Sequence, residues 1–351
     1  MKNLVITGAT GFLGSELLPK ACATYENVYA IVRSKTIEKV REALSIYKNL
    51  KLIPGNIENT DVIENIEDRD KIYQLESDFL HVAAYYNIAS TKSENYITNI
   101  IGTQNIIHFV GQMKKCKSFH YVSSVGVSGN FEGVFEENDL DKKQDFDDFY
   151  ANSKFDAESI VRNWDTKIPK TVYRPGIIIG HSETGAIKKI DGPYYIFQIL
   201  HRFKDFDRFK ELLGMSKYLP MPYSRTVNIP FVPVDEVADF IIMVLKDKRK
   251  FETIQTYHLT GNDGGVNFEM FINQALEVFN YDLRATPLPL SKANDFLGMG
   301  LGFPKEILSY MYKECLYSQE SIKKNYPQFK FKSFDQYSSK FYDFALNQLF
   351  Y

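Results

Sequence analysis

Cysteine and histidine are scarce in this chain, and neither is clustered. The three cysteines, Cys22, Cys116 and Cys315, lie far apart, and the six histidines lack the short helical spacing that a zinc site uses. An odd number of distant cysteines matches neither a disulfide framework nor a metal-ligand pattern. We therefore expect reduced thiols and no bound metal.

An excess of one charge and a long apolar run are also missing. The 42 Lys and Arg residues nearly balance the 44 Asp and Glu residues, so no net field attracts nucleic acid or an anionic membrane. No segment approaches the ~20 apolar residues that span a bilayer, and the apolar run at residues 4–6 is too short for a signal peptide. These absences predict a cytoplasmic protein with no transmembrane segment and no nucleic-acid partner.

Short apolar runs alternate with helical stretches through about residue 180. This alternation is typical of a parallel sheet with helices on both faces, so we predict an α/β, doubly wound fold. The expected strands cover residues 4–7, 28–32, 51–53, 79–82, 119–123 and 171–173.

The alternation stops after Gly180, and residues 188–225 are aromatic and locally basic. Apolar runs at 228–233 and 257–260 predict that the chain then returns to the sheet. We expect a nucleotide-binding domain over residues 1–180 with returns at about 226–262. A smaller, interleaved, mostly helical substrate lobe is expected over 181–225 and 263–351. The acidic stretch 136–148 is interpreted as a solvated loop rather than a functional one.

Three glycines, each three residues from the next, follow the first expected strand. The segment Thr7-Gly8-Ala9-Thr10-Gly11-Phe12-Leu13-Gly14 opens a helix at Phe12, which is the context that a dinucleotide-binding loop requires. Gly8 permits a tight turn, Gly11 lets the backbone approach a pyrophosphate, and Gly14 lets the helix pack closely on the strand. The helix N-terminus supplies amide donors to the anion. The cofactor-binding residues predicted in this loop are Gly8, Thr10, Gly11, Phe12, Leu13 and Gly14.

Arg33 follows the second expected strand, where an enzyme that prefers NAD usually carries a carboxylate for the ribose hydroxyls. Its guanidinium suits a 2′-phosphate, and Lys35 and Arg41 add positive charge nearby. The alternative is that these basic residues are merely solvated. We predict NADPH (NADP+) as the cofactor, with Arg33 and Arg41 as contacts.

Tyr150 and Lys154 are four residues apart, on one face of an expected helix that runs to Trp164. A free tyrosine has a pKa of ~10, and a neighbouring cation favours the phenolate and brings proton exchange toward neutral pH. Tyr150 is therefore the predicted proton-transfer residue, with Lys154 as its cation. The four-residue pattern alone is also compatible with a purely structural helix.

The G-x-x-G-x-x-G loop, together with Tyr150 and Lys154, resembles the extended short-chain dehydrogenases/reductases, which have a Rossmann-type fold. The resemblance implies that Ser124 orients the substrate carbonyl, with Ser123 as the alternative. It implies that Asn99 helps to hold a water near Lys154, and a structural tie between helix and strand is an equal and compatible reading. It also implies cofactor contacts from Asn56 (where the class usually has aspartate), Ile57, Ala83, Ala84, Pro175, Gly176 and Ile177.

Four stretches are similar to the bacterial fatty acyl-CoA reductase and thioester-reductase branch, whose NAD-binding domain is of the male-sterility type. They are residues 120–129, 173–185, 191–195 and 228–235. The likeness covers about residues 4–260. It implies NADPH-dependent reduction of a small-molecule substrate, either a fatty acyl thioester (acyl-CoA or acyl carrier protein) or a fatty aldehyde. One alternative is a reductase or epimerase of another ketone or a sugar nucleotide. Another is a regulator that binds NADP without turnover.

Two aromatic segments follow, and the first of them bears on the substrate. Between residues 194 and 218, four phenylalanines are candidates for an acyl channel and four basic residues for contacts with coenzyme A phosphates or a carrier protein. The alternative is an amphipathic helix with core aromatics and a solvated basic face. The C-terminal run 341–351 is interpreted as a docked helix rather than a contact with membrane or a partner. The channel and phosphate candidates are Phe197, Phe203, Phe206, Phe209, Arg202, Lys204, Arg208 and Lys210.

Overall fold

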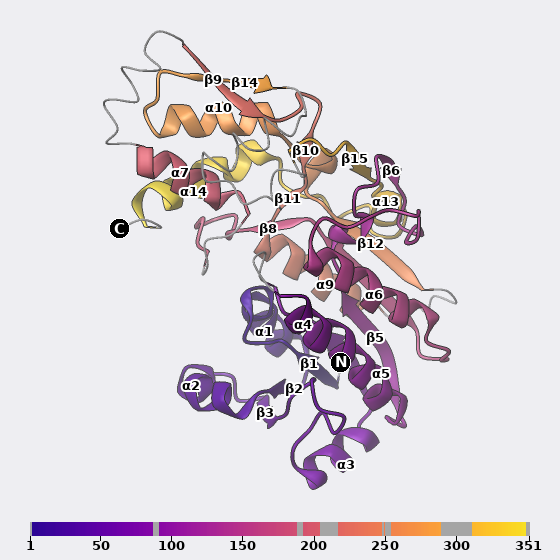
Figure 1. Cartoon of the computed structure of the whole chain (residues 1–351). Coiled ribbons are helices and arrows are strands. Elements are labelled where there is room, and N and C mark those ends of the chain that lie inside the picture. Colours follow the sequence, from indigo (N-terminus) through magenta and orange to yellow (C-terminus); the bar gives the residue numbers. More distant parts are fainter. Residues whose placement is uncertain are drawn as a thin grey trace.

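The computed structural model describes residues 2–86, 91–187, 192–203, 217–247, 249, 254–288 and 311–348, and a seven-stranded sheet lies at its centre (Figure 1). All neighbouring strands are parallel, in the order β12-β7-β5-β4-β1-β2-β3. The α/β, doubly wound prediction is confirmed. The strands are β1 (Asn3–Thr7), β2 (Asn27–Val32), β3 (Leu50–Pro54), β4 (Ser77–His81), β5 (Cys116–Val122), β7 (Lys170–Pro175) and β12 (Gln255–Leu259).

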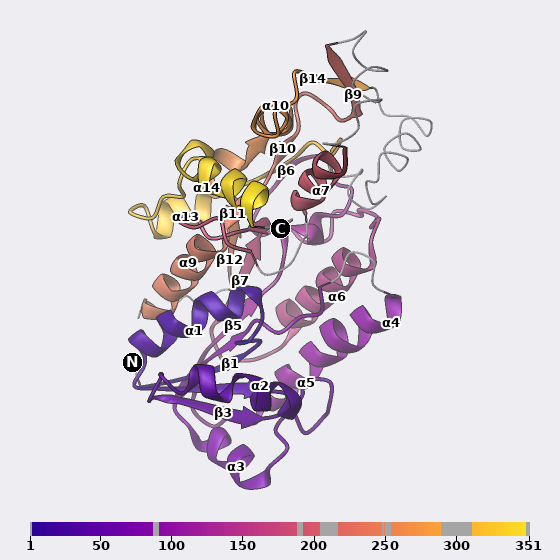
Figure 2. The same cartoon turned by 90° about the vertical axis from the view of Figure 1, so that its left-hand side faces the viewer.

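Helices cover both faces of this sheet (Figure 2). Leu4 and Ile6 pack in one core with helices α1 (Phe12–Thr24) and α9 (Val234–Lys246). Val5 packs in another core with α5 (Gly102–Gly111) and α6 (Phe149–Asn163) on the opposite face. Successive side chains of a strand point to opposite faces, so a strand covered on both sides is a continuous apolar run, as residues 4–6 are.

The strand order reverses between β1 and β4, and the carboxyl ends of both strands meet at one edge of the sheet. In such sheets ligands bind in the crevice at this reversal. The shorter helices are α2 (Ser34–Leu44), α3 (Ile66–Gln74), α4 (Lys92–Asn95), the π-helix η1 (Tyr96–Ile101) and the 3₁₀ helices η2 (Val125–Ser128) and η3 (Asn262–Gly264).

The expected return to the sheet is correct at β12 but wrong at residues 228–233. That stretch forms β10 (Asn228–Ile229), paired with β13 (Val266–Asn267), and β11 (Phe231–Pro233), paired with β8 (Ile177–Ile179). Pro230 separates the two short strands and has no N–H to donate to a ladder. A Cβ on Gly176 would lie 2.0 Å from the Pro230 carbonyl oxygen, so the chain leaves β7 and crosses Pro230 only because residue 176 is glycine.

The predicted substrate lobe combines helices with small sheets above the carboxyl edge of the main sheet (Figure 1). Its core is aromatic, and Phe197, Phe341 and Tyr342 are buried in it. The docked C-terminal helix is confirmed for Phe341 and Tyr342, whereas Leu349, Phe350 and Tyr351 lie outside the described residues. Its helices and strands are α7 (Tyr194–Phe203), β9 (Tyr218–Pro222), α10 (Phe268–Val278), β14 (Arg284–Leu288) and α14 (Phe334–Asn347). β6 (Gly133–Phe135) pairs with β15 (Cys315–Tyr317) in a separate small cluster. The expected lobe is wrong at α13 (Glu320–Asn325), which packs with β12 and α9 in the core of the main sheet.

The acidic stretch 136–148 is largely exposed, as expected, but Glu137 is buried and several groups have specific partners. Glu137 is 4% exposed and accepts a hydrogen bond from the Ser321 backbone N–H at 2.9 Å. The Asp139 carbonyl accepts from Arg174, and Asp148 caps α6 by accepting from the Ala151 backbone N–H. Local composition does not predict the burial of Glu137, because its donor comes from a distant part of the chain.

Candidate active site

The glycine loop between β1 and α1 packs so closely on its neighbours that two of its positions have no room for a side chain. Gly8 has φ of +74°, and a Cβ there would lie 2.5 Å from the Ala83 backbone nitrogen. A Cβ on Gly14 would lie 2.0 Å from the Gly8 carbonyl oxygen. Gly11 precedes the first residue of α1 and donates its N–H to the Gly8 carbonyl at 3.0 Å. The loop is therefore a backbone cradle at a helix N-terminus, which fits the diphosphate of a dinucleotide.

A cavity of about 360 Å³ joins this loop to the predicted proton-transfer residues. Its polar end is formed by the ends of β1, β4, β5 and β7, and its other end by the substrate lobe. The predicted site residues that line it are Gly8, Gly11, Phe12, Leu13, Gly14, Ala83, Ala84, Ser124, Tyr150, Lys154, Pro175, Gly176 and Ile177. Thus segments far apart in the sequence meet at one place.

Ser123 and Ser124 follow β5 and have different partners. Ser124 accepts a hydrogen bond from the Gly126 backbone N–H at 3.0 Å and caps η2. Ser123 is 4% exposed and donates its hydroxyl to Glu158 at 2.6 Å. Because the Ser123 hydroxyl is engaged in a buried network, Ser124 remains the better candidate for a carbonyl.

Tyr150 and Lys154 lie one turn apart on α6, as predicted. The ring of Tyr150 packs edge-on against Tyr86, with 4.7 Å between centroids, and both rings line the cavity. Lys154 is 2% exposed, and its ammonium donates to the Tyr121 hydroxyl at 2.9 Å and to the Val122 carbonyl at 2.7 Å. The lysine is thus held between α6 and β5.

Burial dominates the electrostatics around Lys154. It lowers the pKa of Lys154 to about 7, while the charge of Glu158 acts in the opposite direction. His81, which lies at the end of β4, has its pKa lowered to about 3 by burial and by Lys154. Lys154 therefore titrates near neutral pH beside a histidine that stays uncharged.

Asn99 lies in the π-helix η1 and is buried. It donates to the Ser153 hydroxyl at 2.9 Å and to the Tyr85 carbonyl at 3.1 Å, and accepts from the Tyr85 N–H at 2.7 Å. These bonds give Asn99 a structural role, but they tie η1 to helix α6 and to the segment after β4 rather than to a strand. A role in a proton relay stays a prediction.

The remaining predicted cofactor residues lie outside the cavity lining. Arg33 and Arg41 are exposed, at the start and in the last turn of α2. Thr10 is exposed in the turn of the glycine loop. Asn56 follows β3 and accepts from the Glu58 N–H at 3.1 Å, and Ile57 packs in the core against Gly102. Their contacts with a cofactor stay predictions.

The acyl-channel candidates are partly corrected. Phe197 is 0% exposed and stacks in the lobe core against Phe279, so it does not line the cavity. Phe206, Phe209, Lys204, Arg208 and Lys210, and the side chains of Arg202 and Phe203, lie outside the described residues. The apolar residues that do line the far end are Ile178, Ile187, Ile196, Ile229, Phe231, Phe268, Phe271 and Met311.

Sequence reasoning missed these lining residues, and also Tyr121 and Glu158. Glu158 could have been found, because it continues the four-residue spacing of Tyr150 and Lys154 along α6. Tyr121 lies within the apolar run of β5, and no local pattern distinguishes it there. Among the described residues no group of three or more His, Cys, Asp or Glu is placed to hold a metal ion. In the same part of the chain, no helix is both long and apolar enough to cross a bilayer.

Comparison with known proteins gives three findings. The chain is 26% identical over 293 residues to aldehyde reductase lnbA of Aspergillus flavus, covering 76% of this chain and 27% of that protein. It is 25% identical over 244 residues to fatty acyl-CoA reductase 1 of Xenopus laevis, covering 56% and 47% respectively. The terminal R domain from the myxalamid PKS-NRPS biosynthetic pathway superposes with a TM-score of 0.74 at 24% identity, covering 99% of this chain and 90% of that domain. The chain thus spans about a quarter of the fungal protein and under half of the frog one.

The parallel sheet, the glycine loop and the Tyr150–Lys154 helix define an NAD(P)-dependent oxidoreductase of the extended short-chain dehydrogenase/reductase class. The family model described as "Male sterility protein" matches residues 6–241. The chain belongs to that family.

Proposed function

We propose that this protein is an NADPH-dependent reductase of fatty acyl thioesters, carried by coenzyme A or a carrier protein, or of the corresponding fatty aldehydes. One observation carries the proposal. A single cavity is lined at one end by Gly8, Ser124 and Tyr150, and at the other by Ile196 and Phe271. It offers a cofactor cradle, a polar carbonyl site and an apolar chamber in series.

The residues fit a dinucleotide because a side chain on Gly8 or Gly14 would occupy backbone space at the helix N-terminus. Gly11, Ala83 and Gly176 would complete the cofactor surface, and Arg33 would meet the 2′-phosphate. The bound cofactor supplies a hydride to the carbonyl carbon. The chain's own task is to orient the carbonyl and stabilise its oxygen.

Ser124 and Tyr150 are proposed to hold that oxygen, because hydroxyl donors aimed at developing negative charge lower the barrier. For an aldehyde, Tyr150 gives its proton to the oxygen as the alcohol forms, and Lys154 favours the phenolate that remains. For a thioester, loss of the thiol leaves an aldehyde. The names of the Aspergillus and Xenopus relatives support both substrates.

The apolar end of the cavity supports a long hydrocarbon chain over a sugar. Ile187, Ile229 and Phe268 present methyl groups and a ring there. Burying apolar substrate surface against them contributes roughly 25 cal/mol per Å², whereas sugar hydroxyls without partners would cost free energy.

The first prediction is that purified protein oxidises NADPH with palmitoyl-CoA, an acylated carrier protein or decanal, assayed in parallel with products identified by mass. Tyr150→Phe should lower kcat for decanal by ~10²-fold or more, because it removes the proton donor. Tyr29→Phe, which removes a hydroxyl on β2 that meets Lys51, serves as the control and should stay near wild type. Oxidation with none of the three substrates would refute the proposed function.

A further inference from the structure

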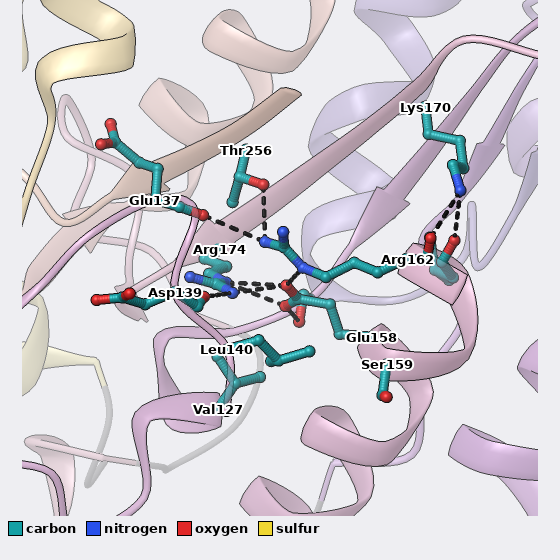
Figure 3. A network of polar contacts seen from close by, with 12 residues as sticks. Val127, Glu137, Asp139, Leu140, Glu158, Ser159, Arg162, Lys170, Arg174 and Thr256 are labelled. Atoms are coloured by element: carbon teal, nitrogen blue, oxygen red, sulfur yellow. Dashed lines mark hydrogen bonds and ion pairs between the residues drawn. The ribbon is translucent and has the colours of Figure 1, made fainter. Parts of the chain in front are cut away.

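A buried carboxylate, Glu158, lies one turn beyond Lys154 on the same face of α6. Tyr150, Lys154, Glu158 and Arg162 follow one another at intervals of four residues, so they form one stripe along the helix. Glu158 is 0% exposed. It lies between the guanidinium groups of Arg162 and Arg174 (Figure 3).

The contacts of Glu158 reach two of the segments that line the polar end of the cavity, at the ends of β5 and β7. Its Oε2 accepts the Ser123 hydroxyl at 2.6 Å, next to Ser124 at the end of β5. Its two oxygens accept from Arg174 Nε at 3.2 and 3.0 Å, and Oε1 accepts from Arg174 Nη2 at 2.7 Å. Arg174 immediately precedes Pro175 and Gly176, which line the cavity.

The two arginines that pair with Glu158 also have further hydrogen-bond partners. Arg162 donates to Glu158 at 2.7 Å and also to the Glu137 carbonyl and the Thr256 hydroxyl. Arg174 is fully buried and contacts the Asp139 carbonyl and, at 3.0 Å, His258 Nε2. A buried charge persists only when it is paired and hydrogen-bonded in this way.

We propose that Glu158 is a positioning residue of the reductase site. Its carboxylate fixes the helix of Tyr150 and Lys154 against Ser123 and Arg174, and it places a buried negative charge one helical turn from Lys154. This inference rests on the proposed function, because it assigns Lys154 to the cofactor and to proton transfer. A purely structural ion pair would stabilise the fold without affecting the charge of Lys154.

Electrostatics agree with this geometry. Burial would raise the pKa of Glu158, but Arg174, Arg162 and Ser123 outweigh burial and lower it to about 2, so the carboxylate is ionised at working pH. Its charge raises the pKa of Lys154 and so opposes the burial of that ammonium.

Near Lys154, the other titratable groups that the structure describes carry no negative charge, so they cannot replace that of Glu158. Tyr121, whose hydroxyl accepts from Lys154, has its pKa raised by burial, Glu158 and Tyr150, so it stays neutral. The pKa of His81 is lowered to about 3 and that of His258 to about 3, so both rings stay uncharged. Glu158 is the charge that opposes the effect of burial on the pKa of Lys154.

The second prediction is tested by the pH dependence of cofactor binding, which needs no turnover. Affinity for NADPH or NADH, whichever the wild type binds more tightly, is measured by fluorescence from pH 5.5 to 9. In the wild type it should fall as Lys154 loses its proton. Glu158→Gln should move that midpoint to lower pH by about one unit or more, because an opposite charge nearby is lost.

Three comparisons make the test specific. Asp156→Asn removes a carboxylate two residues away on α6, hydrogen-bonded to Asn152, and should leave the midpoint unchanged. Glu158→Asp keeps the charge, so its midpoint should stay close to that of the wild type. If Glu158→Gln does not fold, the charge-balanced double variant E158Q/R162Q should show the same shift.

A wild-type midpoint in Glu158→Gln, or in the double variant, with only a lower Tm would overturn the positioning role. That result leaves the proposed function intact. Conversely, a wild type that binds cofactor but reduces no thioester or aldehyde would refute the proposed function. The midpoint comparison would still decide the role of Glu158.

Discussion

Arg33 is the residue on which the proposed cofactor preference depends. Its side chain is exposed where β2 ends, while its backbone carbonyl accepts from the N–H groups of Thr36 and Ile37 at the start of α2. The helix start therefore depends on the backbone of residue 33, and the guanidinium can be removed without disturbing it.

The third prediction is that Arg33→Gln raises KM for NADPH by ~10- to 100-fold, because a hydrogen bond to a charged group contributes about 1.5–3 kcal/mol. KM for NADH should change less than about twofold, since NADH lacks the 2′-phosphate. Lys39→Gln removes an exposed charge from the same helix and is the control. Equal losses for both cofactors would mean that Arg33 does not read the 2′-phosphate. The measurement is steady-state kinetics with each cofactor.

At the residue scale, the sequence predicted the parts of the site that follow a strand or share a helix face. Gly8 to Gly14 and the Tyr150–Lys154 pair are local patterns, and the structure brings both to one cavity. Phe231 and Phe271 were missed because their place in the cavity depends on how the lobe packs. Phe197 was misassigned for the same reason, since an aromatic residue in a helix can face a core or a channel.

At the scale of elements, helix α9 carries a buried carboxylate that its sequence does not explain. Glu236 is 7% exposed in the first turn. Its Oε1 accepts from the Lys332 backbone N–H at 2.9 Å, and its Oε2 has no hydrogen-bond partner among the described residues. Burial raises the pKa of Glu236 to about 7, with Asp235 adding to the rise and Lys332 opposing it.

The fourth prediction follows from the sign of this shift. Between about pH 4.5 and 7 the folded protein binds a proton that the unfolded chain releases, so the contribution of Glu236 to stability falls as pH rises. Glu236→Gln should therefore increase the free energy of unfolding at pH 8 by roughly 1–2 kcal/mol. At pH 4.5 it should have little effect. Urea unfolding at the two pH values measures the difference.

Asp239→Asn is the matched control for this helix. Asp239 is half-exposed and pairs with Lys20 at the surface, so its removal should change stability little at either pH. A Glu236→Gln variant that gains nothing at pH 8 would show that the carboxylate is solvated in the folded protein.

The order of strands and helices was predictable because buried parallel strands are continuous apolar runs. The two-stranded sheets around Pro230 could not be predicted. Their pairing partners, such as β8 and β11, lie some fifty residues apart, and the local sequence pattern does not indicate which strands pair. The burial of Glu137 has the same origin, since its donor, Ser321, comes from the far end of the chain.

At the scale of the whole molecule, three buried histidines link stability to pH. His81 and His120 lie on neighbouring strands of the sheet, and His258 lies on its edge strand β12. Burial, the largest influence on each, lowers their pKa values to about 3, 4 and 3 respectively. All three rings are hydrogen-bonded in the uncharged form, so folding selects that form throughout the sheet.

The fifth prediction is acid destabilisation that begins below about pH 6.5, the usual histidine pKa. In that range the unfolded chain binds protons that the folded protein excludes, so stability is full above pH 6.5 and is lost as pH falls toward 4. Each histidine contributes a slope of up to ~1.4 kcal/mol per pH unit. His120→Gln, whose amide can meet Tyr173 and Ser118, should lower the slope by about that amount in urea unfolding between pH 5 and 6.5. His108→Gln, at an exposed position, should not change it, and equal slopes in all three proteins would show that His120 does not contribute to the acid sensitivity.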